Sequence, residues 1–255
     1  MATHTKGSTK RPLSLTAALP ETQDDRTASL RQPRRRQSWL ARRQASLFFR
    51  RLPRSGPHAL GNLRVWNDDA IAPKTGFPPH PHRDMEIITY VREGAITHED
   101  SLGNKGRTEA GDVQVMSAGT GVRHSEYNLE DVTTKIFQIW ILPTRNGEAP
   151  SWGARPFPKG ERAGHFETLA SGYEGDGDAL PIRTDARIVA ATLQAGETAE
   201  YPIGANRKAY LVPATGAVEI EDVRVNARDG AAIRDIDVIR VTAIEDSEIV
   251  LVDAA

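Results

Sequence analysis

The sequence predicts an all-β protein that is built from two β-sandwich or barrel units. From residue 63 onward, short runs of β-branched and aromatic residues alternate with Gly, Asn, Asp and Pro. This alternation is typical of many short strands that are joined by turns. No stretch shows the apolar periodicity of a long amphipathic helix. We therefore expect only short helices, and we expect them in the connection between the two units.

Residues 1–58 do not follow the strand pattern. They are rich in Lys, Arg, Ser, Thr and Pro, and such a composition buries too little apolar surface to order a chain. The basic run RRRQSWLARR at 34–43 could be read as a nuclear-localisation or nucleic-acid motif. Basic runs match such motifs easily, so we favour a disordered, solvated tail over direct binding to nucleic acid.

Two segments carry the predicted strands. Residues 59–145 form the first unit, with strands in NLRVWNDD, MEIITYV, GAITHED, GDVQVMSAGTG and TKIFQIWILP. Residues 146–182 are rich in Gly, Pro and charged residues and are predicted to be a connection. The pattern resumes over 183–255, with strands in ARIVAATL, KAYLVPATGAVEI, VRVNARDGAAI, VIRVTAI and SEIVLVD. The strand density is similar, which indicates a second β unit.

Composition excludes several classes of site. The chain has no cysteine, so disulfides, thiolate metal sites and cysteine nucleophiles are excluded. Its net charge of -1 gives no general attraction to nucleic acid or to an anionic membrane. No apolar run approaches the roughly 20 residues that a membrane span needs. The N-terminus lacks the continuous apolar core of a secretory signal, so we expect a cytoplasmic protein.

Two histidine-containing pairs stand beside strong predicted strands. His80 and His82 are two residues apart, and so are His124 and Glu126. Residues two apart in a strand point to the same face, and Pro81 favours an extended backbone. Glu86 has the same parity as the first pair. If the two segments are neighbours in a sheet, three imidazoles and a carboxylate converge, a set that suits a divalent Fe, Mn, Ni, Cu or Zn ion.

Either pair alone is more often a hydrogen-bonded core or surface feature than a metal site. Two pairs with the same spacing, each next to a strand, favour the metal site. The remaining histidines show no such pairing: His4, His58, His98 and His165.

The segment GFPPHPHRDMEIITYVREG resembles the first cupin motif, in which a glycine precedes His-x-His and a glutamate and another glycine follow. GDVQVMSAGTGVRHSEYN resembles the second cupin motif, which ends in an asparagine, here Asn128. Together with LRVWNDD, HEDSLGN and FQIWILP, these segments are similar to sequences of the pirin family of bicupins, near its bacterial quercetinase-like members. The resemblance is dense from Leu63 to about Pro143 and looser beyond it.

This resemblance implies a ligand set and a metal. The ligands would be His80, His82, His124 and Glu126, and the usual metal of the family is iron, so Fe(II) is expected. Glu86 occupies the place of the ligand glutamate in ordinary cupins, and in pirins it would instead support the ligands from behind. Residues 183–255 contain no histidine, so the second cupin is expected to be metal-free.

The resemblance also implies a function. The leading interpretation is an oxidoreductase like quercetin 2,3-dioxygenase, which cleaves a flavonol with O2, with Glu126 as a metal ligand and as the acceptor of the substrate's hydroxyl proton. The alternative is an iron-dependent redox sensor that acts on a protein partner as a transcriptional coregulator, without turnover. The same four ligands would serve both functions.

The family pattern fails just before the LRV segment, where this chain reads SWLARRQASLFFRRLPRSGPHALGN. Codons can be chosen for residues 50–58 that read, one base later, as Ala-Gly-Tyr-Arg-Asp-Pro-Ala-His, close to the family's Tyr, Asp-Pro and His-Met at this place. We therefore hypothesise that a stretch ending near His58 is translated out of frame relative to the family. The alternative is a genuinely divergent segment.

Overall fold

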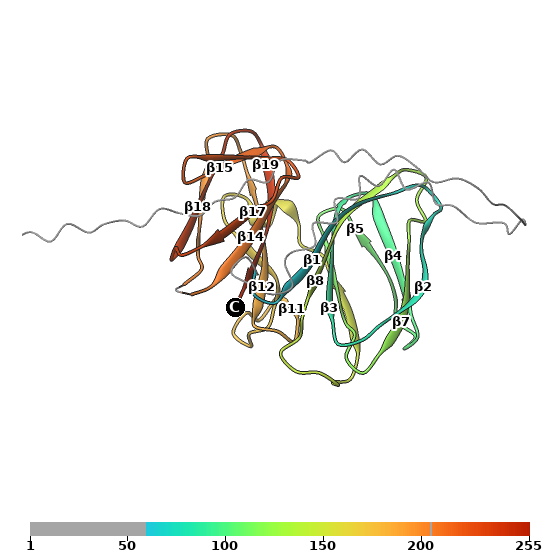
Figure 1. The fold of residues 1–255 in the computed structure, drawn as a ribbon. Helices are drawn as coiled ribbons and strands as arrows, with labels where there is room; N and C mark the ends of the chain where they lie inside the picture. The colour runs from blue at the N-terminus through green and yellow to red at the C-terminus, as the bar shows by residue number, and fades with distance from the viewer. Residues whose placement is uncertain (1–59, 205) are drawn as a thin grey trace, which may run out of the picture.

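The structure is a computed structural model that describes residues 60–204 and 206–255, so the expectations for residues 1–58 lie outside it. The described chain forms two β units that lie side by side, the first coloured blue to green and the second orange to red (Figure 1). The one helix among the described residues is a short 3-10 helix in the connection, η1 Lys159–Arg162. The predicted all-β class is confirmed. None of the described helices is long and apolar enough to cross a membrane.

The first unit is a sandwich of two sheets, with strand orders β1-β8-β3-β6-β9 and β2-β7-β4-β5. All their pairings are antiparallel. The strands are β1 Leu63–Ile71, β2 Gly76–His82, β3 Glu86–Glu93, β4 Ala95–Asp100, β5 Lys105–Glu109, β6 Val113–Ser117, β7 Val122–Tyr127, β8 Thr134–Ile141 and β9 Ser151–Arg155.

The second unit pairs a sheet of order β11-β10-β12-β19-β14-β17 with one of order β13-β18-β15-β16. The predicted connection, residues 146–182, adds β9 to the first unit and β10 and β11 to the second. The strands are β10 Glu167–Ser171, β11 Leu180–Pro181, β12 Ala186–Leu193, β13 Thr198–Pro202, β14 Lys208–Thr215, β15 Ala217–Ile220, β16 Val223–Asn226, β17 Ala231–Arg234, β18 Val238–Ala243 and β19 Ser247–Ala254.

Strand position explains the local sequence. β3 is buried on both faces, between β8 and β6, and its central segment IITYV is accordingly apolar at four of five positions. β2 lies at the edge of its sheet and carries Pro78, Pro79 and Pro81. Proline lacks a backbone N–H, so it is tolerated at a sheet edge but not in its centre. The His-Pro-His sequence thus fits an edge strand.

The two units share one apolar core. Ile88 and Tyr90 on β3 and Phe137 on β8 pack into the same cluster as Tyr210 and Val250 of the second unit. The interiors of the two sandwiches differ. The interior of the second unit holds one large apolar cluster. Among the described residues, the interior of the first unit holds two small apolar clusters. The first unit also buries histidine, glutamate and glutamine side chains, namely His98, His124, Glu86, Glu126, Gln114 and Gln138, and this polar interior holds the candidate site.

Candidate metal centre

Three imidazoles meet inside the first unit. β2 and β7 pair antiparallel with His80 directly opposite His124, and their Nε2 atoms are 3.1 Å apart. The ring of His82 lies 4.8 Å from that of His80 and 5.0 Å from that of His124, centroid to centroid. One ring nitrogen of each residue lies within 4.8 Å of the others. The structure therefore brings the two sequence segments side by side, with their histidines on one face.

The protonation of these rings suits metal binding. Nδ1 of His80 lies 2.8 Å from the carbonyl oxygen of Pro78; a carbonyl only accepts, so Nδ1 carries the proton and Nε2 carries the lone pair. Burial, with a smaller contribution from His80, lowers the pKa of His82 to about 4. Burial and the neighbouring imidazoles lower the pKa of His124 to about 3. Neutral imidazoles that converge in this way fit a divalent transition metal.

Glu126 lies deeper in the same interior, and only 1% of it is exposed. Its carboxylate accepts hydrogen bonds from the Thr89 hydroxyl at 3.0 Å and from the amides of Gln114 and Gln138, each at 2.6 Å. Burial raises the pKa of Glu126 to about 7, although these hydrogen bonds act in the opposite direction. The amide of Gln138 is oriented by the Trp140 indole, which donates to its oxygen at 3.1 Å. The carboxylate is thus held in one position.

The carboxylate of Glu126 belongs to a second group of potential ligands that shares His124 with the first. Its members are His98, His124 and Glu126, with one ligand atom of each within 4.8 Å of the others. His98 was not among the predicted site residues, because it has no histidine or glutamate two positions away. The available signal was its place on the inward face of the GAITHED strand, two residues after the buried Ile96.

Glu86 is not a member of either group of potential ligands, and its expected supporting role behind the ligands stays a prediction. Asp84 has a φ of 45°, and the chain turns there between β2 and β3, which belong to different sheets. The parity that Glu86 shares with the two histidines is therefore lost at the turn. Its carboxylate accepts instead from the Ser117 hydroxyl at 2.6 Å and from the backbone N–H of Arg183 at 3.1 Å. Burial raises its pKa.

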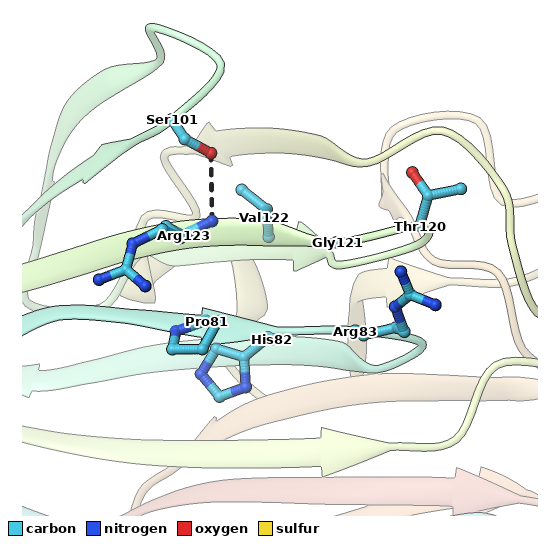
Figure 2. A pocket seen from close by; sticks show the side chains of 8 residues that line it. All are labelled: Pro81, His82, Arg83, Ser101, Thr120, Gly121, Val122 and Arg123. Carbon is cyan, nitrogen blue, oxygen red and sulfur yellow. Dashed lines mark hydrogen bonds between the residues drawn. The ribbon is translucent and has the colours of Figure 1, made fainter.

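A pocket of about 440 Å³ opens beside His82 (Figure 2). Two arginines line it, Arg83 and Arg123, and neither forms an ion pair with a carboxylate of the described residues. The backbone N–H of Arg123 donates to the Ser101 hydroxyl at 3.1 Å, which ties the β7 strand to the turn after β4. Pro81 and Arg123 alternate with the histidines along the paired strands, so they belong to the face of the sheet opposite His80 and His124. The full lining comprises Pro81, His82, Arg83, Ser101, Thr120, Gly121, Val122 and Arg123.

Comparison with known proteins identifies the family. Residues 27–141 match the family model of Pirin, and residues 168–254 match that of the quercetinase C-terminal cupin domain. A pirin-like protein of Caulobacter vibrioides is 71% identical over 195 residues, which cover 76% of this chain and 84% of the relative. This chain belongs to the pirin family. The predicted family and its bicupin architecture are confirmed.

Other pirins extend this relationship. The quercetin 2,3-dioxygenase of Escherichia coli K12 is 40% identical over 192 residues, which cover 75% of this pirin and 81% of the relative. The crystal structure of the bacterial pirin YhhW from Escherichia coli in complex with nickel(II) has a TM-score of 0.71 and 38% identity, and it covers 78% of this pirin and 86% of that chain. A metal is thus bound in a related protein with the same fold.

Proposed function

We propose that this pirin is a metal-dependent dioxygenase that cleaves quercetin or a related flavonol at its 2,3-bond with O2. The observation that carries the proposal is the convergence of His80, His82 and His124 in the polar interior of the first unit. These three residues and Glu126 would hold the metal, most suitably Fe(II). When bound, the metal would act as a Lewis acid that lowers the pKa of the flavonol 3-hydroxyl and supports its reaction with O2, in which the C2–C3 and C3–C4 bonds break, C3 leaves as carbon monoxide and both oxygen atoms of O2 remain in the ring-opened product.

Glu126 would accept the proton of that hydroxyl. A general base works best when its pKa is close to the working pH, and burial raises the pKa of Glu126 to about 7. Thr89, Gln114 and Gln138 hold the carboxylate on both oxygens, so it does not need to reorient during the reaction. The site therefore combines three neutral donors with one carboxylate that can gain or lose a proton near neutral pH.

The pocket beside His82 supports a small aromatic substrate. Its volume of about 440 Å³ falls within the roughly 300–1,000 Å³ that is typical of small-molecule sites. The Trp140 ring lies edge-on to that of His82 at 5.0 Å and would offer an aromatic surface next to the metal.

The test is quercetin consumption in air, followed by visible absorbance and by carbon monoxide release. We expect iron-loaded protein to consume quercetin, and we expect His80→Ala to abolish the activity. An iron-loaded protein that leaves quercetin intact would contradict the proposal. It would favour the alternative, a redox sensor that uses the same ligands without turnover.

A further inference from the structure

His98 connects a carboxylate to one of the candidate metal ligands. It is fully buried on β4, and its Nε2 atom lies 3.3 Å from Oδ2 of Asp100. Its Nδ1 atom lies 3.4 Å from Nδ1 of His124. The Trp152 ring stacks on the imidazole at 4.9 Å with an interplanar angle of 10°, so the orientation of the ring is fixed by packing as well as by polar contacts.

Asp100 determines which nitrogen of His98 carries the proton. The Asp100 carboxylate accepts hydrogen bonds from the backbone N–H groups of Leu102 and Asn104, at 2.9 and 3.0 Å, and from the Asn104 amide at 2.9 Å. The carboxylate is the acceptor in these three hydrogen bonds. In its fourth contact, the one with Nε2 of His98, it also accepts, so Nε2 must be the donor. A neutral imidazole has one donor and one acceptor nitrogen, which leaves Nδ1 of His98 as an acceptor.

The tautomer of His98 in turn determines the tautomer of His124. Because Nδ1 of His98 accepts, Nδ1 of His124 must carry the proton that it donates. The lone pair of His124 is then on Nε2, which faces Nε2 of His80 at 3.1 Å. Both nitrogens of His98 are used by this chain of contacts, so His98 itself has no lone pair left for a metal, although it lies close to His124 and Glu126.

We propose that His98, held by Asp100, is a positioning residue that selects the metal-binding tautomer of His124. Partners of this kind behind a ligating histidine fix its tautomer and its ring orientation. Here the carboxylate would act through a second imidazole rather than directly. The inference rests on the proposed metal site but not on the proposed flavonol chemistry, because it concerns binding of the metal alone.

The first test needs no variant. Long-range ¹H–¹⁵N NMR spectra of metal-free protein labelled with ¹⁵N-histidine report the tautomer of each ring. We expect His124 to be protonated on Nδ1 and His98 on Nε2. A His124 ring that is protonated on Nε2 would overturn the proposal.

The second test compares two substitutions of similar size. His98→Gln keeps a strong acceptor for the Nδ1 proton of His124, whereas His98→Met offers only a weakly accepting sulfur. With nickel(II) as the probe, we expect His98→Met to weaken binding about 10–100-fold, the range typical for partners behind a ligand, and His98→Gln to stay within a few-fold of the parent protein. Equal losses in the two variants would indicate a merely structural role for His98.

X-ray absorption of the nickel-loaded parent protein provides the third readout, the number of coordinated imidazoles. We expect three. A fourth imidazole would show that His98 is itself a ligand and would overturn the proposal. None of these measurements uses quercetin, so the failure of the flavonol activity would leave this inference intact, and failure of the inference would leave the activity to be judged separately.

Discussion

The Nε2 atoms of His80 and His124 face each other at 3.1 Å across the β2–β7 pair. In both residues Nδ1 is engaged elsewhere, by the carbonyl of Pro78 and by His98. The two Nε2 atoms therefore present lone pairs to the same space. Lone pairs that converge in this way are what two imidazole ligands of one metal ion present.

Removal of one of these ligands should abolish tight metal binding without unfolding the protein. We expect the nickel(II) affinity of His80→Ala to fall by more than about 100-fold. This loss exceeds the usual effect of changing a residue that contacts a ligand but does not itself bind the metal. His80 is only partly buried on an edge strand, so the thermal midpoint of the metal-free protein should change little. Isothermal titration calorimetry measures the affinity. The matched control is His165→Ala, an exposed histidine in the connection, which should bind as the parent does.

The ligand pairs could be predicted from the sequence because strand parity is a local property. His80 with His82, and His124 with Glu126, each need only an extended backbone to point to one face. The same argument does not extend to Glu86, because the left-handed Asp84 lies between it and the histidines. Parity can be followed along one strand but not through a turn whose geometry is unknown.

His98 could not be assigned from the sequence because its role depends on a third strand. β4 pairs with β7 so that Asp100 lies opposite His124 and His98 lies opposite Glu126. Nothing local to residues 94–100 indicates that register. The same limit applies to Gln114 and Gln138, which come from β6 and β8 of the facing sheet and meet Glu126 only when the sandwich closes. Such partners are determined by tertiary packing.

A methyl group at Gly106 should disturb the support of His98. A Cβ atom there would lie 2.2 Å from the Trp152 ring, which stacks on His98. We expect Gly106→Ala to lower the free energy of unfolding by about 1–3 kcal/mol, as overpacking usually does, and to weaken nickel(II) binding. Urea denaturation and calorimetry measure the two effects. Gly153→Ala is the control, since its Cβ would meet only Leu180 at an ordinary 3.5 Å; equal effects of the two changes would contradict the explanation.

The shared core predicts that the two units unfold together. Tyr210 of the second unit lies 5.4 Å from Trp66 of the first, centroid to centroid, within one continuous cluster. We expect Tyr210→Ala to lower the free energy of unfolding by about 3–5 kcal/mol, the usual range for a large aromatic in a core. All tryptophans precede residue 153, so fluorescence reports on the first half, whereas far-UV circular dichroism reports on the whole chain.

In Tyr210→Ala, the unfolding midpoints measured by fluorescence and by circular dichroism should shift by the same amount. Tyr210→Phe keeps the ring and should shift both midpoints much less. A fluorescence midpoint that does not move in Tyr210→Ala would show that the first unit unfolds independently.

The coding DNA tests the hypothesis that residues up to about 58 are out of frame. We expect the codons of residues 50–58 to read Ala-Gly-Tyr-Arg-Asp-Pro-Ala-His when they are read one base later. The alignment now covers 84% of the Caulobacter relative, and the corrected translation should cover a larger share of it. Codons that do not permit this reading would establish a divergent segment instead.

The raised pKa of Glu126 predicts how the stability of the metal-free protein depends on pH. Burial raises this pKa from 4.5 to about 7, so between these values the folded protein holds a proton that the unfolded chain has released. The free energy of unfolding therefore falls as the pH rises through this range, by about 3 kcal/mol for this residue. The stabilisation is complete below the unfolded pKa and is lost above the folded one.

Glu126→Gln should remove this dependence, because the amide cannot ionise. We expect the variant to gain about 3 kcal/mol relative to the parent protein between pH 4.5 and pH 8, measured by denaturant unfolding after metal removal. Other buried acids, such as Glu248, are common to both proteins and cancel in the comparison. If the difference in the free energy of unfolding between the two proteins stayed constant across this range, Glu126 would already be ionised in the folded state at low pH. Its three hydrogen bonds would then outweigh its burial, and it could not serve as a base near neutral pH.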